Sequence, residues 1–184
     1  MRNAAFMLVA FANPALVGAV CPSSRWLASA MADAARGAKL LVELGAGTGS
    51  ITEALVAQHP AVPLVAVELQ RGLARLLQQR FSHIDVRRAS AHEVLEAVHE
   101  QAPPHTVLVS SLPFQSLPAQ WRERTVDAIT VFLRAEARRR LVQYTYGLKT
   151  PFALPADSEL QWIRIGRVWR NAPPASIWSL QRRE

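Results

Sequence analysis

Residues 41–56 read LVELGAGTGSITEALV, in which an apolar run meets one acid, three alternate glycines and then a helical pattern. The apolar run at residues 39–44 is typical of a strand buried on both faces of a parallel sheet. Residues 50–59 are expected to form the helix that follows. A glycine turn between such a strand and helix predicts the first βα unit of an open α/β sheet, where ligands bind at the C-terminal ends of the strands.

The alternation of strand and helix continues along the chain. Further strands are expected at 63–69, 84–90, 106–114 and 140–147, and further helices at 23–35, 71–81, 91–100 and 119–134. Later, two strands follow each other without a helix at 160–171 and 175–183, which is typical of a hairpin. We therefore predict a doubly wound α/β domain at residues 21–184, with a mostly parallel, seven-stranded sheet and a C-terminal antiparallel hairpin.

The charge and composition of the chain indicate which kinds of partner it could bind. The 184 residues include 21 basic and 14 acidic side chains, a net charge of +7, which favours anionic partners such as nucleic acid or acidic lipid. An arginine bias of the genome would give the same excess without any function. The single cysteine, Cys21, excludes an intramolecular disulfide and fits a reducing cytoplasm. The five histidines are scattered, so no metal is predicted.

The apolar N-terminal segment, residues 1–20, is too short to cross a membrane. Asn13 and Pro14 interrupt the apolar run that follows Arg2. A helix of about ten residues spans only ~15 Å, half of a bilayer core. We expect the segment either to lie in a membrane interface or to pack on the domain.

The glycine turn predicts a nucleoside ligand. Gly45 permits the tight turn, Gly47 lets a ligand lie against the backbone, and Gly49 brings the next helix close. Glu68 follows nineteen residues after Gly49, where an acid accepts hydrogen bonds from a ribose diol. Glu43 would repel a pyrophosphate but can receive an ammonium group. We therefore predict S-adenosylmethionine, in preference to a dinucleotide or to a turn that binds nothing.

The chain resembles class I methyltransferases in the motifs ELGAGTG (43–49), VEL (67–69) and SLPF (111–114). Within them it resembles the branch shared by rRNA adenine dimethylases and small bacterial phospholipid N-methyltransferases. Stretches at 17–31, 110–118, 141–147 and 164–178 are similar to the phospholipid enzymes, so the resemblance covers nearly the whole chain. It implies a Rossmann-like class I methyltransferase fold. It also implies stepwise methylation of the amine of phosphatidylethanolamine towards phosphatidylcholine, with S-adenosylhomocysteine as product.

The resemblance assigns residues along the chain to the cofactor. They are Ser23, Ser24, Glu43, Gly45, Ala46, Gly47, Gly49, Glu68, Leu69, Ser90, Ala91, Ser110 and Leu112. The two serines of this set at a helix N-terminus are expected to bind the methionine carboxylate. Two positions depart from the family pattern: Gln70 and Ser90 stand where aspartates are usual. Ser90 would still accept a hydrogen bond from the adenine amino group, at a cost of about 1–2 kcal/mol in cofactor affinity.

The acceptor site is expected at the ends of the fourth and fifth strands. Ser111 stands where adenine dimethylases have the asparagine that recognises adenine, which disfavours adenine and favours a lipid amine. Backbone carbonyls beside Pro113 would accept from a substrate N–H group, and the Phe114 ring would face the amine. Tyr144 and Tyr146 lie on one strand face, either as a cation–π wall for the methylated ammonium or as sheet packing.

Arginines are the candidate ligands of the lipid phosphate. We predict Arg25, Arg164 and Arg170 for this role, with the last two on one face of the hairpin strand and Arg167 on the other. Nearby tryptophans would either sit at a membrane interface or bury the sheet edge: Trp162, Trp169 and Trp178.

The preferred hypothesis is a cytoplasmic monomer associated peripherally with the inner face of the cytoplasmic membrane. Its partners would be a phospholipid substrate and an anionic membrane surface, not nucleic acid. Two alternatives stay open: a methyltransferase acting on N6 of adenine in rRNA or another nucleic acid, and a non-catalytic lipid-binding protein that holds the cofactor. Small-molecule acceptors also remain open, because the fold alone does not select a substrate.

Overall fold

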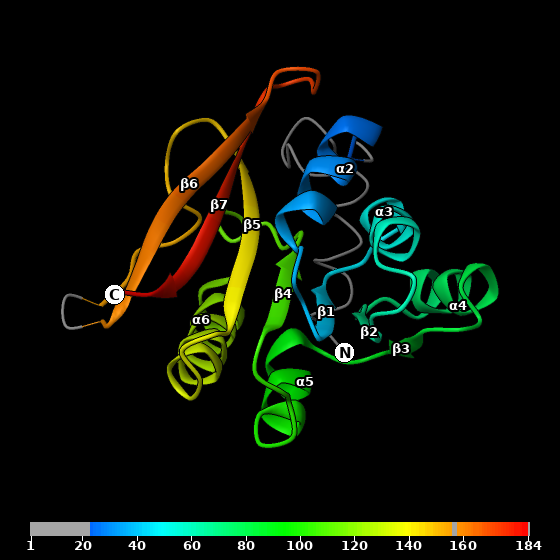
Figure 1. Ribbon diagram of the computed structural model, residues 1–184, viewed down its shortest axis with the longest axis horizontal. Helices are drawn as coiled ribbons and strands as arrows, with labels where there is room; N and C mark the ends of the chain where they lie inside the picture. Colours follow the sequence, from blue (N-terminus) through cyan, green and yellow to red (C-terminus); the bar gives the residue numbers. More distant parts are fainter. Residues whose placement is uncertain (1–22, 156–157, 184) are drawn as a thin grey trace.

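The computed structural model describes residues 23–155 and 158–183; the predicted N-terminal segment and Cys21 lie outside these ranges. One seven-stranded sheet has helices on both faces (Figure 1). Its strands are β1 (Leu40–Leu44), β2 (Leu64–Val67), β3 (Asp85–Arg87), β4 (Thr106–Ser110), β5 (Arg140–Tyr146), β6 (Leu160–Val168) and β7 (Ala175–Arg182). The helices are α2 (Arg25–Ala34), α3 (Ser50–Gln58), α4 (Arg71–Arg80), α5 (Ala91–Val98) and α6 (Ala119–Arg134).

The strand order is β3-β2-β1-β4-β5-β7-β6. Strands β1 to β5 pair in parallel, and β7 is antiparallel to both β5 and β6. The doubly wound sheet and its antiparallel hairpin are therefore confirmed, and it is the second hairpin strand that joins β5. The order reverses between β1 and β4, which is where open α/β sheets hold their ligands.

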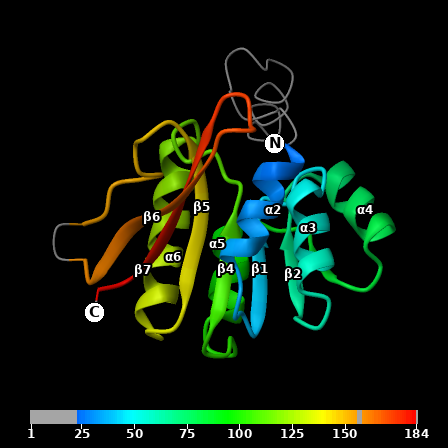
Figure 2. The same cartoon turned by 45° about the horizontal axis from the view of Figure 1, so that its top comes forward.

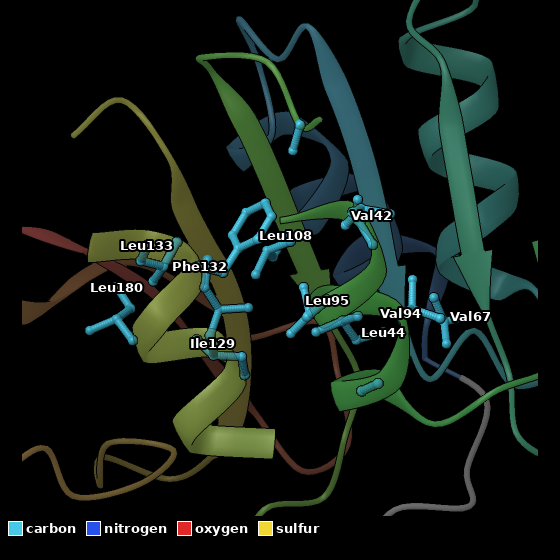
Figure 3. Packing of buried hydrophobic residues seen from close by; sticks show 14 of the residues in the cluster. Val42, Leu44, Val67, Val94, Leu95, Leu108, Ile129, Phe132, Leu133 and Leu180 are labelled. Atoms are coloured by element: carbon cyan, nitrogen blue, oxygen red, sulfur yellow. The ribbon is translucent and has the colours of Figure 1, made fainter. Parts of the chain in front are cut away.

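Apolar side chains fill both faces of the sheet. On one face, Val42, Leu44 and Leu108 pack against α5 and α6 through Leu95 and Phe132 (Figure 3). On the other face, a second cluster joins α2 and α3 to β1, β4 and β5. Continuous apolar strands are buried on both sides because helices cover both faces, as the sequence predicts.

The sequence pattern predicts that α2 buries Trp26, Leu27, Ala30 and Met31, and the buried stripe differs from this prediction. Leu27, Ala28, Met31 and Ala32 are buried, whereas Trp26 is 42% exposed. The small alanines let α2 lie close against α3, with which it makes its most extensive helix contact. The Trp26 ring is left at the surface beside two arginine side chains.

A β-bulge in β6 corrects the predicted faces of the hairpin arginines. Arg164 pairs with Trp178, and Arg167 pairs with Ser176, with the register shifting between Arg164 and Gly166. The extra residue inverts the alternation of side chains between the two faces of β6, so Arg164 and Arg167 lie on the same face. The sequence pattern predicts them on opposite faces. Arg170 lies beyond the end of β6, in the turn before β7. The predicted common face of Arg164 and Arg170 is therefore wrong.

Candidate cofactor and acceptor site

The glycine turn after β1 forms a cradle of backbone groups. Gly45, Gly47 and Gly49 all have positive φ angles, of +78°, +58° and +88°. The N–H groups of Gly45 and Ala46 both donate to the Val67 carbonyl, at 2.9 and 3.0 Å, which fastens the turn to the end of β2. Side chains other than glycine adopt such angles at a cost of about 1–2 kcal/mol for each residue.

Packing also requires glycine at two of these positions. A Cβ atom on Gly45 would lie 2.8 Å from Cδ2 of Leu112, a residue assigned to the cofactor site in the loop after β4. A Cβ atom on Gly49 would lie 2.9 Å from both Leu77 and Phe81 of the α4 region. This close contact involves α4, whereas the sequence predicts that Gly49 brings the helix directly after the turn close.

Glu43 is a fully buried acid at the end of β1. Its Oε2 atom accepts a 2.6 Å hydrogen bond from the Thr52 hydroxyl of α3, while Oε1 has no hydrogen-bond partner. Burial, aided by the nearby Glu68 carboxylate, raises the pKa of Glu43 to about 8. A buried acceptor without a partner beside a glycine cradle fits a cationic ligand group, because a positive charge would satisfy the atom and ionise the acid.

Glu68, after β2, holds the turn in shape. Its two carboxylate oxygens accept the N–H groups of Gly47, at 2.9 Å, and of Gln70, at 2.7 Å. Each oxygen keeps a further lone pair, so the predicted hydrogen bonds to a ribose diol remain available. Burial raises the pKa of this carboxyl as well, although the bonds from Gln70 and Gly47 oppose the shift.

The predicted adenine side lies at the start of α5, where Ser90 is the N-cap. The Ser90 hydroxyl donates to Glu93 Oε2 at 2.6 Å and accepts from the Glu93 N–H at 3.4 Å, which completes a capping box. The Ser90 oxygen also lies 3.4 Å from His92 Nε2, so a ligand amino group would have to replace or share this contact. Ala91 and the neighbouring His92 are buried, and the His92 Nδ1 atom has no partner.

Gln70 is the other departure from the pattern of the family that the sequence resembles, and it follows Glu68 and Leu69. Leu69 is exposed, and Gln70 begins the turn into α4. The Gln70 Nε2 atom is buried without a hydrogen-bond partner. An amide donor therefore stands where the family usually has an acid.

Replacing Ser90 by alanine tests its two roles separately. Loss of the N-cap is expected to lower stability by about 1 kcal/mol, or the melting temperature by roughly 2–4 °C. If the hydroxyl also binds adenine, the dissociation constant for S-adenosylmethionine rises about fivefold. Glu93→Ala is the matched control, because it breaks the capping box and leaves the Ser90 oxygen in place. Equal loss of affinity in both variants would mean that Ser90 only caps the helix.

The predicted acceptor loop follows β4. Ser110 is buried and accepts from the Leu112 N–H at 3.2 Å, and the Ser111 N–H donates to the Leu44 carbonyl. The Leu112 carbonyl accepts from the Phe114 N–H, at 3.0 Å, and from Gln143 Nε2, at 3.2 Å. Ser111 itself is half-buried, beside a loop that these bonds fix to β1 and β5.

The aromatic candidates lie on opposite faces of the sheet. The Phe114 ring is buried against Phe152, with centroids 4.8 Å apart, within the cluster that covers the α5 and α6 face. Tyr144 and Tyr146 pack together edge-to-face at 5.5 Å, next to the cluster on the α2 face. The structure therefore brings the two tyrosines together, as predicted, and places Phe114 in a separate aromatic group.

The N-terminus of α2 contacts the turn between β6 and β7. Ser24 is the N-cap: its hydroxyl accepts from the Leu27 N–H and donates to the Arg170 carbonyl. The Ser24 N–H donates to Asn171 Oδ1 at 3.3 Å. Arg25 and Arg170 therefore lie near each other, whereas Arg164 lies on the strand face described above. Ser23 is half-buried at the same helix end.

Two residues of this region were not predicted. Thr52 bonds the key acid Glu43, and Gln143 holds the Leu112 carbonyl. The signal for Gln143 is a polar residue in an apolar strand, since buried polar groups are almost always hydrogen-bonded. The signal for Thr52 is weaker: a hydroxyl in the first turn of the helix after the glycines.

The described residues provide two further structural facts. Within 23–155 and 158–183, none of the helices combines the length and hydropathy needed to cross a bilayer. In the same part of the chain, His, Cys, Asp and Glu side chains do not gather in threes as metal ligands would.

Comparison with known proteins gives two sequence relatives. No family model matches the chain. An ornithine lipid N-methyltransferase of Singulisphaera acidiphila is 29% identical over 117 residues, which cover 60% of this chain and 61% of that protein. A ribosomal RNA small subunit methyltransferase A of Synechococcus sp. is 52% identical over 42 residues, 23% of this chain and 14% of that protein. The chain thus spans less than two thirds of the length of either relative.

Solved structures agree on the fold. The 1,6-didemethyltoxoflavin-N1-methyltransferase of Burkholderia thailandensis, solved with 1,6-didemethyltoxoflavin and S-adenosylhomocysteine, superposes with a TM-score of 0.62 at 14% identity. The match covers 88% of this chain and 79% of that one. The chain therefore has the Rossmann-like fold of class I S-adenosylmethionine-dependent methyltransferases.

Proposed function

We propose that the protein is an S-adenosylmethionine-dependent N-methyltransferase that methylates the amine of phosphatidylethanolamine and of its mono- and dimethyl derivatives. The observation that carries the proposal is the 29% identity, over 60% of the chain, to an enzyme named for N-methylation of a lipid. The paired tyrosines at the C-terminal end of β5 support the same substrate class, because they suit a methylated ammonium group.

Residues of the cradle would hold the cofactor, which supplies an electrophilic methyl group. Glu43 would receive the ammonium of its methionine part, and Glu68 would accept from the ribose hydroxyls. Ser23 would bind the carboxylate at the N-terminus of α2. Ser24, which the sequence also predicts for this role, uses its hydroxyl and its N–H as donors to Arg170 and Asn171 and has no donor left for a carboxylate. The backbone at Gly45 and Gly47 would lie against the ligand, since neither residue carries a side chain that would intervene.

At the acceptor side, the protein must hold an uncharged amine in line with the methyl group. Positioning and electrostatics contribute most of the acceleration in such a displacement, so a strong base is not required. We assign the amine contact to the Ser111 hydroxyl and neighbouring carbonyls. The Leu112 carbonyl already accepts two hydrogen bonds, so the Ser111 groups are the better acceptors. Phe114 would act through the packing of this loop.

A nucleic-acid adenine methyltransferase is the second candidate. The local identity of 52% to a ribosomal RNA methyltransferase, together with the net charge of +7, favours it. Ser111 opposes it, because a serine lacks the amide that reads both the donor and acceptor sites of adenine. The match to the RNA enzyme also covers only 14% of that protein. A protein that holds the cofactor without turnover is the remaining alternative.

A lipid substrate would place the protein at a membrane. We propose a cytoplasmic monomer that associates peripherally with the inner face of the cytoplasmic membrane. Arg25 and Arg170, which lie near each other at the α2 end of the site, would clamp the lipid phosphate. Arg164 would contribute less, because it lies within β6 opposite Trp178, well before the turn that contains Arg170.

Replacing Tyr144 by leucine is expected to slow the later methylations most. The ring would attract the cationic, partly methylated head group, and its loss removes about 0.5–2 kcal/mol, up to roughly 30-fold in rate. The monomethyl lipid should then accumulate in a time course resolved by thin-layer chromatography. Tyr144→Phe keeps the ring and should retain the normal product pattern. An equal slowing of every methylation in the leucine variant would contradict a cation–π role.

The proposal is tested by offering the protein separate acceptors with radiolabelled S-adenosylmethionine. The acceptors are vesicles of phosphatidylethanolamine with an anionic lipid, and structured RNA. Label in mono-, di- or trimethylated lipid supports the proposal and reveals the last methyl group added. Label in RNA alone supports the second candidate. Cofactor binding without label in either acceptor would contradict both and would favour a non-catalytic or small-molecule role.

A further inference from the structure

Two tryptophans stand at the surface where α2 meets the β6–β7 turn. Trp26 is 42% exposed and Trp169 is 68% exposed. They belong to segments far apart in the sequence, which Ser24 joins through its bonds to Arg170 and Asn171. Figure 2 shows this turn beside the start of α2. Large exposed aromatic rings on a fixed scaffold are typical of an interaction site.

Arginines stack on both rings. The guanidinium carbons of Arg25 and Arg170 each lie 4.8 Å from the Trp26 ring centroid, and that of Arg167 lies 4.0 Å from the Trp169 centroid. Among the described residues, no acidic side chain forms an ion pair with any of the three. Stacking holds a guanidinium plane in place while its N–H groups still point outward from the edge, ready for phosphate oxygens.

These five residues, Arg25, Trp26, Arg167, Trp169 and Arg170, form what we call the Trp–Arg surface. It lies at the C-terminal edge of the parallel strands, because Tyr146 at the end of β5 pairs with Ala175 just after the turn. The proposed acceptor site opens at the same edge. Whatever binds the Trp–Arg surface is therefore held close to the two tyrosines.

The chemistry of the surface suits a lipid head-group layer. Tryptophan rings settle at the level of the head groups, and each arginine near an anionic leaflet adds about fivefold to binding. Single-stranded RNA also binds aromatic rings and arginines. Leu148, 58% exposed, lies next to Gly147, whose carbonyl accepts from Ser176 near the turn. The aliphatic Leu148 side chain can insert among acyl chains, but it has no ring that could stack on a nucleic-acid base. Its exposure therefore favours a bilayer over RNA as the partner.

We infer that the Trp–Arg surface docks on an anionic phospholipid bilayer and so presents head groups to the acceptor site. The inference rests on the proposed function, because docking would deliver the lipid substrate to the acceptor site. Its test measures binding and does not require methyl transfer. Docking would also explain why three arginines are left without acidic partners on a surface of the described chain.

The test is co-sedimentation of the full chain with vesicles of phosphatidylcholine, with and without phosphatidylglycerol. The double variant Arg167→Gln, Trp169→Ser should lower partitioning onto the anionic vesicles at least about fivefold, which is the loss of one arginine, with a further loss from the ring. The matched control is Arg75→Gln, Leu76→Ser, which removes one charge and one exposed apolar side chain from α4. It should bind within about twofold of the unaltered chain, since α4 lies away from this surface.

Brominated lipids supply a second measurement. They should quench tryptophan fluorescence of the unaltered chain and quench the double variant less. Equal losses of binding in the double variant and the control, or unchanged binding in both, would overturn the docking surface. Loss of structured-RNA binding in the double variant, with vesicle binding unchanged, would also overturn it.

Activity distinguishes failure of this inference from failure of the proposed function. With detergent-dispersed phosphatidylethanolamine, the double variant should transfer methyl groups as fast as the unaltered chain, and it should be slow only on vesicles. If the unaltered chain methylates the dispersed lipid but does not bind anionic vesicles, the docking surface is wrong and the function stands. If it binds vesicles through this surface but methylates no lipid, the surface stands and the function is wrong.

Discussion

Glu43→Gln is expected to weaken binding of S-adenosylmethionine strongly and yet to stabilise the folded protein above pH 8. The glutamine keeps a hydrogen-bond acceptor for Thr52 but cannot provide the negative charge that an ammonium group requires. Hydrogen bonds to charged groups contribute about 1.5–3 kcal/mol, so the dissociation constant should rise at least tenfold and up to roughly 150-fold. Isothermal titration of the variant against the unaltered chain measures this loss.

The stability change follows from the pKa of Glu43. Burial raises the pKa of this group from 4.5 to about 8 in the folded chain, so folding retains a proton that the unfolded chain loses. The resulting stabilisation is complete below pH 4.5 and is lost as the pH rises through about 8. The variant lacks this titration, and its melting temperature should exceed that of the unaltered chain by several degrees at alkaline pH.

Cofactor affinity should show the opposite trend. A cationic ligand stabilises the ionised acid, so binding to the unaltered chain should release a proton below pH 8 and tighten as the pH rises towards 8. Titrations in buffers of different ionisation enthalpy detect the released proton. A melting temperature and an affinity that are both independent of pH across this range would show that Glu43 is already ionised in the folded protein.

The second large effect is expected for Gly45→Val. The residue has a φ of +78°, and a Cβ atom there would lie 2.8 Å from the Leu112 side chain. The angle costs about 1–2 kcal/mol and the overlap about 1–3 kcal/mol, so the melting temperature should fall by roughly 4–20 °C. Displacement of the turn should also weaken cofactor binding beyond the range of titration, because the cradle is made of backbone groups.

Gly72→Ala is the matched control for this variant. Gly72 lies in α4, and no atom would come within 4 Å of the added Cβ. Alanine in a helix is more favourable than glycine by up to about 1 kcal/mol, so this variant should melt at the same or a higher temperature. A Gly45→Val protein that melts and binds like the unaltered chain would contradict the close packing of the turn against Leu112.

The order of strands and helices could be predicted because the signals were local. Apolar runs flanked by turns located β1, β2 and β4, and the limits of α6 agree with the sequence pattern to the residue. The faces of individual elements were harder. The stripe on α2 depends on its neighbour α3, and the exposed position of Trp26 depends on a turn far along the chain. A one-residue bulge in β6 inverted the alternation and cannot be read from periodicity alone.

For the site, the sequence predicts which residues gather at the glycine turn but not how the Phe114 ring packs. The glycines, Glu43 and Glu68 lie in one cradle because their spacing is fixed by a single βα unit and the next strand. Phe114 was expected to face the amine, but its ring packs against Phe152 from a distant loop. Contacts of this kind depend on tertiary packing, which a short motif does not contain.

The most direct test measures tritium transferred from S-adenosylmethionine into a phosphatidylethanolamine extract, with Glu43→Gln as the weakened control and the cofactor held below the dissociation constant of the unaltered chain. We expect label in the lipid with the unaltered chain and at least about tenfold fewer counts with the variant. Cofactor binding by the unaltered chain with no label in the lipid would contradict lipid N-methylation.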